Sequence, residues 1–166
     1  MYERFCRSAV RMGATGAKVV ATKKVFTAEW VRLKCRYGCG GWGKRLTCPP
    51  YSPTPEETRR VLDEYESAVL IHCPSGSGSM PGEIVPKLER EAFLAGYYKA
   101  FGFASGPCGL CQRCSLKACA HPAQARPAME ASGIDVFRTA RAAGFPIEVV
   151  RAPDCSQNYY GLVLIE

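Results

Sequence analysis

Four cysteines within twelve residues constrain this chain more than any other feature. Cys108, Cys111, Cys114 and Cys119 lie in the segment GPCGLCQRCSLKACAHP, with the spacing C-x2-C-x2-C-x4-C. Thiols held this close together form disulfides, bind a zinc ion or bind an iron–sulfur cluster. The choice among these three decides most of what the sequence implies about function.

The spacing of this C-terminal set favours an iron–sulfur cluster. Three cysteines at intervals of three residues, followed by a more distant one, are close to the bacterial ferredoxin pattern. A structural zinc site usually has two C-x2-C pairs separated by a longer spacer, so zinc is the weaker alternative. Gly106 and Gly109 allow backbone N–H groups to approach the sulfurs. We expect His121 to neighbour this site rather than to bind the metal.

A second set of cysteines precedes the first. Cys35, Cys39 and Cys48 are separated by three and eight residues, with four glycines among them and the sequence CPP at the end. Proline after a ligand cysteine turns the chain away from the site, and the glycines allow the backbone to fold closely around sulfur. The alternative is a glycine-rich loop with incidental buried cysteines. We expect a second metal centre.

Three thiolates leave the fourth ligand of the N-terminal centre open. The candidates are Cys155, Cys73 and Cys6, and a fourth possibility is that no protein ligand exists. An iron without a protein ligand can bind and polarise a small molecule, as an open zinc position does. A cluster ligated at every iron favours electron transfer instead.

Composition and charge set the compartment and the class of partner. The sequence shows no secretory signal and no membrane-length apolar run, so we expect a soluble cytoplasmic protein in which thiols stay reduced. Residues 1–45 carry eleven Lys/Arg against two acidic residues. This basic third fits a small anionic ligand, an acidic protein or nucleic acid, although a solvated face is the simpler interpretation. Nucleic acid and membrane are not the expected partners.

The order of the elements predicts one α/β domain spanning residues 1–166, with α+β as the alternative. We expect a mixed sheet flanked by helices and two cysteine-rich metal-binding loops. The predicted strands cover 29–35, 68–73, 145–151 and 159–166. The predicted helices cover 55–67 and 86–100, after a short helix and a strand or hairpin within 1–30. A further helix is predicted from a capping box at Ser132 and Asp135 to Ala143. Thr54, Pro55 and Glu57 form a capping box before the first long helix.

Three segments resemble an uncharacterised family of cysteine-rich, predicted metal-binding proteins of anaerobic bacteria and archaea. They are VRLKCRYGCGGWGKRLTCPPYSPTPEET, GPCGLCQRCSLKACAHPAQARPAMEASGIDVFRTA and YYGLVLIE. The resemblance implies metal ligands at Cys35, Cys39 and Cys48 and at Cys108, Cys111, Cys114 and Cys119. It implies no reaction, and Cys6, Cys73 and Cys155 are not part of the pattern.

The leading functional hypothesis is a protein with two 4Fe–4S clusters that transfers electrons, as a carrier or as an accessory to a redox enzyme. One alternative is an enzyme or sensor that binds a small anionic ligand at an open iron, with Lys44 and Arg45 beside it. Another is a zinc-dependent nucleic-acid-binding module. We expect Glu130 to cap a helix, the alternative being a role near a cluster.

Overall fold

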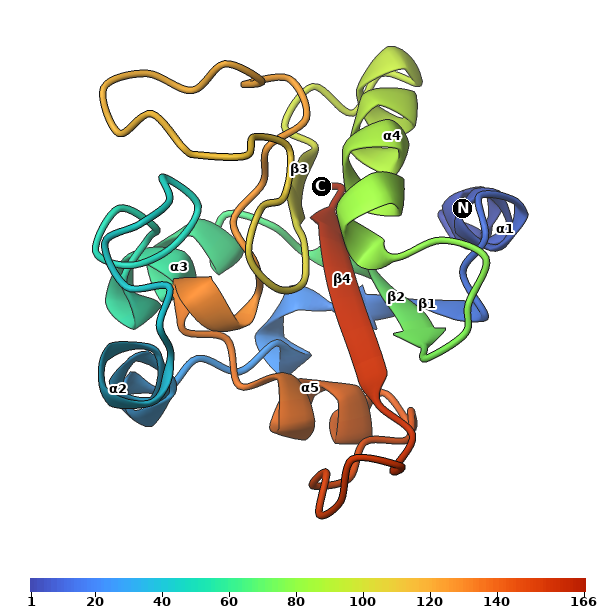
Figure 1. Cartoon of the computed structure of the whole chain (residues 1–166). Helices are drawn as coiled ribbons and strands as arrows, with labels where there is room; N and C mark the ends of the chain where they lie inside the picture. Colours follow the sequence, from blue (N-terminus) through green and yellow to red (C-terminus); the bar gives the residue numbers. More distant parts are fainter.

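Five α-helices and a four-stranded sheet build the computed structural model of the chain, which describes residues 1–166 (Figure 1). In chain order, the elements are α1 (Glu3–Arg11), β1 (Gly16–Ala21), the 3-10 helix η1 (Thr22–Lys24), α2 (Glu29–Gly38), α3 (Pro55–Leu62), β2 (Ser67–Pro74), α4 (Pro81–Leu94), β3 (Phe101–Phe103), the 3-10 helix η2 (Glu130–Ser132), α5 (Val136–Ala142) and β4 (Asn158–Leu164). None of these helices has the length and apolar character needed to cross a membrane.

The sheet has the strand order β1-β2-β4-β3, and every ladder in it is antiparallel. Strand β4 pairs with β2 through Leu70 and Leu162 and with β3 through Phe103 and Leu162. Strands β2 and β3, joined through α4, run in the same direction, but β4 lies between them and keeps them from pairing. The predicted α/β class is confirmed, whereas the expected mixture of parallel and antiparallel ladders was wrong because of this inserted strand.

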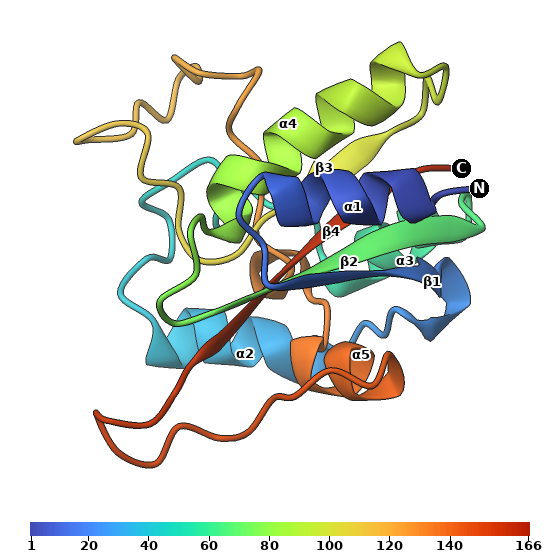
Figure 2. The ribbon, with the colours of Figure 1, turned by 90° about the vertical axis from the view of Figure 1, so that its right-hand side faces the viewer.

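Two hydrophobic cores cover the two faces of the sheet, as alternating side chains of β2 predict. Val69, Ile71 and Cys73 face a core shared with α1 and α4, whereas Ala68 and Leu70 face a core shared with α3, α5 and the residues that flank η2. Figure 2 shows α1 and α4 above the sheet and α2 and α5 below it. Helix α2 packs against η2, and this contact places the N-terminal cysteines beside the second core.

Local sequence signals located several element boundaries correctly. The Thr54 side chain accepts a hydrogen bond from the Glu57 backbone N–H, and the Glu57 carboxylate accepts one from the Thr54 backbone N–H. Pro55 begins α3. The capping box predicted at Ser132 and Asp135 was wrong, because Ser132 ends η2 and Asp135 itself is the N-cap of α5, accepting from the Arg138 N–H. The predicted buried strand at 68–73 is β2, all of whose interior residues are buried. The start of α3 and the place of β2 were predictable because the capping residues and the apolar run act through neighbours in sequence.

Three other local predictions were wrong. Residues 29–35 form helix α2 rather than a strand, since Val31 and Cys35 are one turn apart and turn inward together while Trp30 and Leu33 stay exposed. Residues 145–151 form no strand. Helix α4 begins at Pro81 and ends at Leu94, so the apolar sequence after it, including the exposed Tyr98, lies in a turn before β3.

Candidate metal centres

Cys35, Cys39 and Cys48 line one hollow of about 320 Å³. Cys35 lies in the last turn of α2, Cys39 directly follows this helix, and Cys48 lies at the far end of the next loop. The Gly41 N–H donates to Cys39 Sγ at 3.4 Å. A methyl group at Gly41 would lie 3.5 Å from Cys39 Sγ and 3.9 Å from Cys48 Sγ, so both sulfurs face the same small space.

The backbone of this N-terminal loop holds its own shape. The Gly43 N–H donates to the Pro49 carbonyl at 2.8 Å, and the Cys48 N–H donates to the Arg45 carbonyl at 3.1 Å. The carbonyl of Cys48 in turn accepts from the N–H groups of the two residues after Pro50. Gly43 has a φ of 70°, a left-handed conformation that favours glycine. Backbone hydrogen bonds and one left-handed glycine thus define the shape of this loop.

The C-terminal set is arranged differently. Cys108, Cys111, Cys114 and Cys119 line one narrow hollow of about 20 Å³, together with His121. Residues 107–120 make no backbone–backbone hydrogen bond, and the His121 N–H donates to Cys119 Sγ at 3.4 Å. A space of this size holds about one water molecule, so this loop has to open to surround a larger group.

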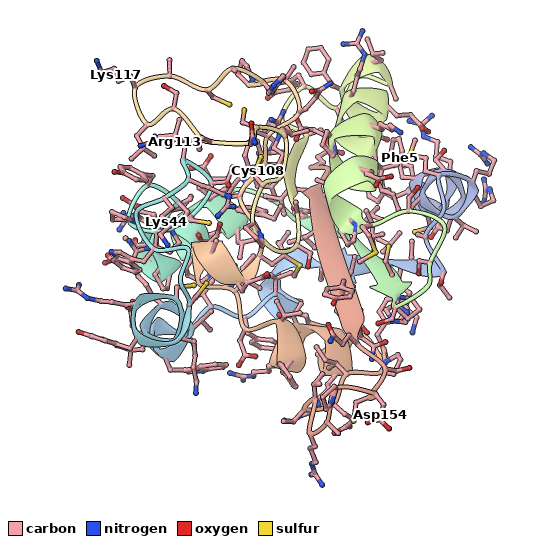
Figure 3. The ribbon with its side chains drawn as sticks, viewed as in Figure 1. Phe5, Lys44, Cys108, Arg113, Lys117 and Asp154 are labelled. Atoms are coloured by element: carbon pink, nitrogen blue, oxygen red, sulfur yellow. The ribbon has the colours of Figure 1, made fainter.

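Arg45 joins the two cysteine loops. Its Nε donates to the carbonyl of Cys108 at 2.9 Å, and its side chain lines the hollows of both sets. Figure 3 shows Lys44 and Cys108 on neighbouring loops at the same side of the molecule. The two predicted centres therefore lie next to each other, although their cysteines are 60 to 84 residues apart in sequence.

A strongly basic cleft of about 730 Å³ opens between the same two loops. Its lining includes Cys111 and Cys114 but no acidic residue. The four cations that line it are Lys44, Arg45, Arg113 and Lys117. Figure 3 shows Arg113 and Lys117 along the outer loop, above Lys44. Its charge favours an anion or an acidic surface.

The three remaining cysteines lie away from both hollows. Cys73 is fully buried in the core under α1 and α4, where burial raises the pKa of its thiol to about 11. Cys6 packs against the same core, and Cys155 is exposed in the loop before β4. All ten cysteines are free thiols. None of these three lines the hollow of Cys35, Cys39 and Cys48.

Glu130 is the carboxylate beside the N-terminal set. It lines the same hollow as Cys35, and its Oε1 accepts from the Gly106 N–H at 2.9 Å. Burial raises the pKa of the Glu130 carboxyl. The expectation that Glu130 caps a helix was wrong, because Met129 is the N-cap residue of η2 and Asp135 is that of α5. Only the folded chain places η2 against α2, so the sequence held no local signal for this position.

The donors in both sets are thiols, which suit a soft metal. Burial is the main cause that raises the pKa of the Cys35 and Cys48 thiols, so metal binding there would release protons. No three His, Cys, Asp or Glu side chains converge closely enough to hold one metal ion. A tetrahedral zinc site places its sulfurs about 3.8 Å apart, from Zn–S bonds of about 2.3 Å. Thiolates select zinc or iron–sulfur clusters over hard cations.

The fold and the two thiol-lined hollows define a small cysteine-rich α/β protein with two candidate metal sites. The chain belongs to the family described as predicted metal-binding protein (DUF2284), whose model matches residues 18–165. This match spans both cysteine sets and every strand of the sheet except the start of β1. No curated protein and no solved structure matches the chain.

Proposed function

We propose that the protein carries two 4Fe–4S clusters, one in each cysteine set, and transfers electrons as a carrier or as an accessory to a redox enzyme. The observation that carries this proposal is the division of seven free thiols between two adjacent hollows. Cys35, Cys39 and Cys48 would hold one cluster, and the other set, Cys108, Cys111, Cys114 and Cys119, would hold the second. A bound cluster supplies a one-electron acceptor and donor.

The surroundings of the thiols support this assignment. Backbone N–H groups already point at Cys39 Sγ and Cys119 Sγ, and such hydrogen bonds stabilise the negative charge of cluster sulfurs and set the potential. The loop 107–120, which lacks backbone hydrogen bonds of its own, would gain its order from the cluster.

Metal analysis of anaerobically purified protein tests the proposal directly. We expect about eight irons per chain, a matching amount of acid-labile sulfide and broad absorption near 400 nm. The substitutions Cys39→Ser and Cys114→Ser should each remove about half of the iron. Cys155→Ser is the matched control, because this exposed thiol lines neither hollow, and it should keep all of the iron. A colourless protein with stoichiometric zinc would refute the clusters.

The basic cleft supports an acidic redox partner. Its cations lie between the two sets of thiols, where an acidic surface would approach both clusters. Electrostatic steering of this kind weakens as salt is added. With a small acidic ferredoxin as electron donor, we expect the reduction rate to fall as sodium chloride rises. Arg113→Glu should reduce both the rate and its salt dependence, whereas Arg151→Glu, at an exposed position outside the cleft, should leave both unchanged.

A second candidate is an enzyme or sensor that binds a small anionic ligand at the N-terminal centre. Lys44 and Arg45 line the same hollow as Cys48, and this set supplies only three thiolates. Cyanide should then change the visible spectrum of the wild-type protein but not that of a Cys39→Ser variant that has lost this cluster. An unchanged spectrum in the wild type would count against an open position. The zinc-dependent nucleic-acid-binding alternative requires zinc in the metal analysis and a salt-sensitive shift of single-stranded or duplex DNA.

A further inference from the structure

A second hollow reaches Cys35 and Cys39 without Lys44 or Arg45 in its lining. It is a pocket of about 390 Å³ between α2, η2, α5 and β4. Ten of its fourteen lining residues are hydrophobic, which is the usual composition of a small-molecule site. The lining residues are Trp30, Val31, Lys34, Cys35, Cys39, Ser105, Glu130, Ile134, Val136, Phe137, Ile147, Asn158, Tyr159 and Tyr160.

This pocket shares part of its lining with the candidate N-terminal metal centre. Cys35, Cys39 and Glu130 line both the apolar pocket and the hollow of the N-terminal set. Lys44 and Arg45 line only the latter. A molecule in the apolar pocket would therefore reach the thiols of Cys35 and Cys39 without passing the basic loop.

The floor of the pocket is rigid because the second core supports it. Tyr160 is buried, stacks on His72 with ring centroids 4.9 Å apart, and donates its hydroxyl to the Pro146 carbonyl. The Oδ1 of Asn158 lies 2.7 Å from His72 Nε2. Phe145 packs against both aromatic rings. These side chains keep Asn158 and Tyr160 in place, so the pocket exists before a ligand arrives.

Polar groups in the lining have no partner within the protein. The amide nitrogen of Asn158 and the hydroxyl of Ser105 make no hydrogen bond, and Glu130 uses only Oε1. The side chains of Ser105 and Asn158 are partly shielded from solvent. Polar groups that line an otherwise apolar pocket and lack partners are available to orient a ligand. A highly charged molecule would lose its hydration there against mostly hydrophobic side chains.

We propose that this pocket binds a small, neutral, mostly apolar organic molecule with one polar end. Its carbon skeleton packs against Trp30, Val136 and Phe137, and its polar end faces Ser105, Asn158 and Glu130, next to Cys35 and Cys39. The binding claim stands on the pocket alone. The statement that the ligand lies beside a cluster rests on the proposed function.

Occupancy is measured with N-phenyl-1-naphthylamine, a neutral apolar fluorophore, added to the purified metal-loaded protein. We expect a saturable rise in fluorescence that 2-phenylethanol reverses and sodium citrate does not. Val136→Trp fills the pocket from the half-buried face of α5 and should weaken binding at least tenfold. Leu33→Trp adds the same side chain at an exposed position of α2 outside the pocket, and should bind as the wild type does. Circular dichroism checks that both variants are folded.

The same samples separate this inference from the proposed function. Equal binding by the wild type and Val136→Trp, or no saturable binding, would overturn the pocket, whatever the iron content. Iron content and the electron paramagnetic resonance spectrum of the reduced protein report on the clusters. A spectral change on adding the fluorophore, absent in Val136→Trp, supports a ligand beside the N-terminal centre. Binding without such a change in an iron-loaded sample would overturn that placement.

Discussion

The ion pair between Glu89 and Arg126 anchors the end of the C-terminal cysteine loop, and its removal should be costly. Arg126 donates from Nε and Nη2 to the two carboxylate oxygens of Glu89 on α4, both at 2.6 Å. Glu89 Oε2 also accepts from the Gly102 N–H of β3 at 2.8 Å. Arg126 Nη1 donates to the carbonyls of Pro122 and Ala125, so one guanidinium ties α4, β3 and the loop together.

The magnitude follows from the burial of this pair. The Arg126 and Glu89 side chains are only 14% and 13% exposed. Removing one partner of a buried, hydrogen-bonded ion pair costs about 3–5 kcal/mol. Because some exposure remains, we expect Glu89→Ala to lower the free energy of unfolding by about 3 kcal/mol. For a chain of this size, each kcal/mol shifts Tm by about 2–4 °C, so Tm should fall by about 6–12 °C.

Thermal unfolding followed by circular dichroism measures this effect, with Glu56→Ala as the matched control. Glu56 pairs with Arg60 on the exposed side of α3, where the two side chains are 77% and 63% exposed. Exposed pairs of this kind contribute about 0.3–0.5 kcal/mol. Its loss should lower Tm by about 1–2 °C. A drop for Glu89→Ala no larger than that of the control would refute the anchoring role of the pair.

Three further predictions concern the backbone, a buried thiol and the cluster loop. Gly133→Ala should destabilise the fold by at least about 2 kcal/mol in urea unfolding, because Gly133 has a φ of 77° and an added Cβ would lie 2.7 Å from Pro55 Cα. Gly82→Ala, where nothing lies within 4 Å, should not destabilise it. Burial and a pKa raised to about 11 keep the Cys73 thiol protonated at pH 8. In the folded protein, iodoacetamide should therefore label the exposed Cys155 but not Cys73, and labelling of Cys73 should rise only as the pH approaches 11. Mass spectrometry that finds Cys73 labelled at pH 8 would contradict this. After chelation of the metal, trypsin should cut first at Arg113 and Lys117, because their loop has no backbone hydrogen bonds. Cleavage first at Arg45 would show instead that the hydrogen-bonded N-terminal loop is the less stable of the two.

Sequence reasoning succeeded where the cause is local. The capping box at Thr54 set the start of α3, and the apolar run 68–73 set β2. The α/β class was also predictable, because alternating strand and helix signals survive small errors in the boundaries. The ligand assignment at the seven cysteines, and the identity of the metal, stay predictions.

Sequence reasoning failed where tertiary packing decides. Segment 29–35 alternates apolar and polar residues as a strand does, yet it forms a helix that packs against η2, with Val31 buried and Cys35 half-buried on the same face. Strand β3 has only three residues and no pattern long enough to be recognised. The place of Glu130 and the apolar pocket depend on contacts between segments about a hundred residues apart, which no local pattern contains.

The central position of β4 affects the order of events during synthesis. Strands β2 and β3 are held in one sheet only through β4, yet β4 is the last of the four strands to leave the ribosome. Leu164 follows Cys119 by 45 residues. The ribosome needs roughly 2–9 s to synthesise this segment at about 5–20 residues per second. All seven candidate ligand thiols thus emerge while the sheet is still in two parts. The nascent chain passes through an interval in which metal delivery and oxidation compete for these thiols, before the scaffold closes around them.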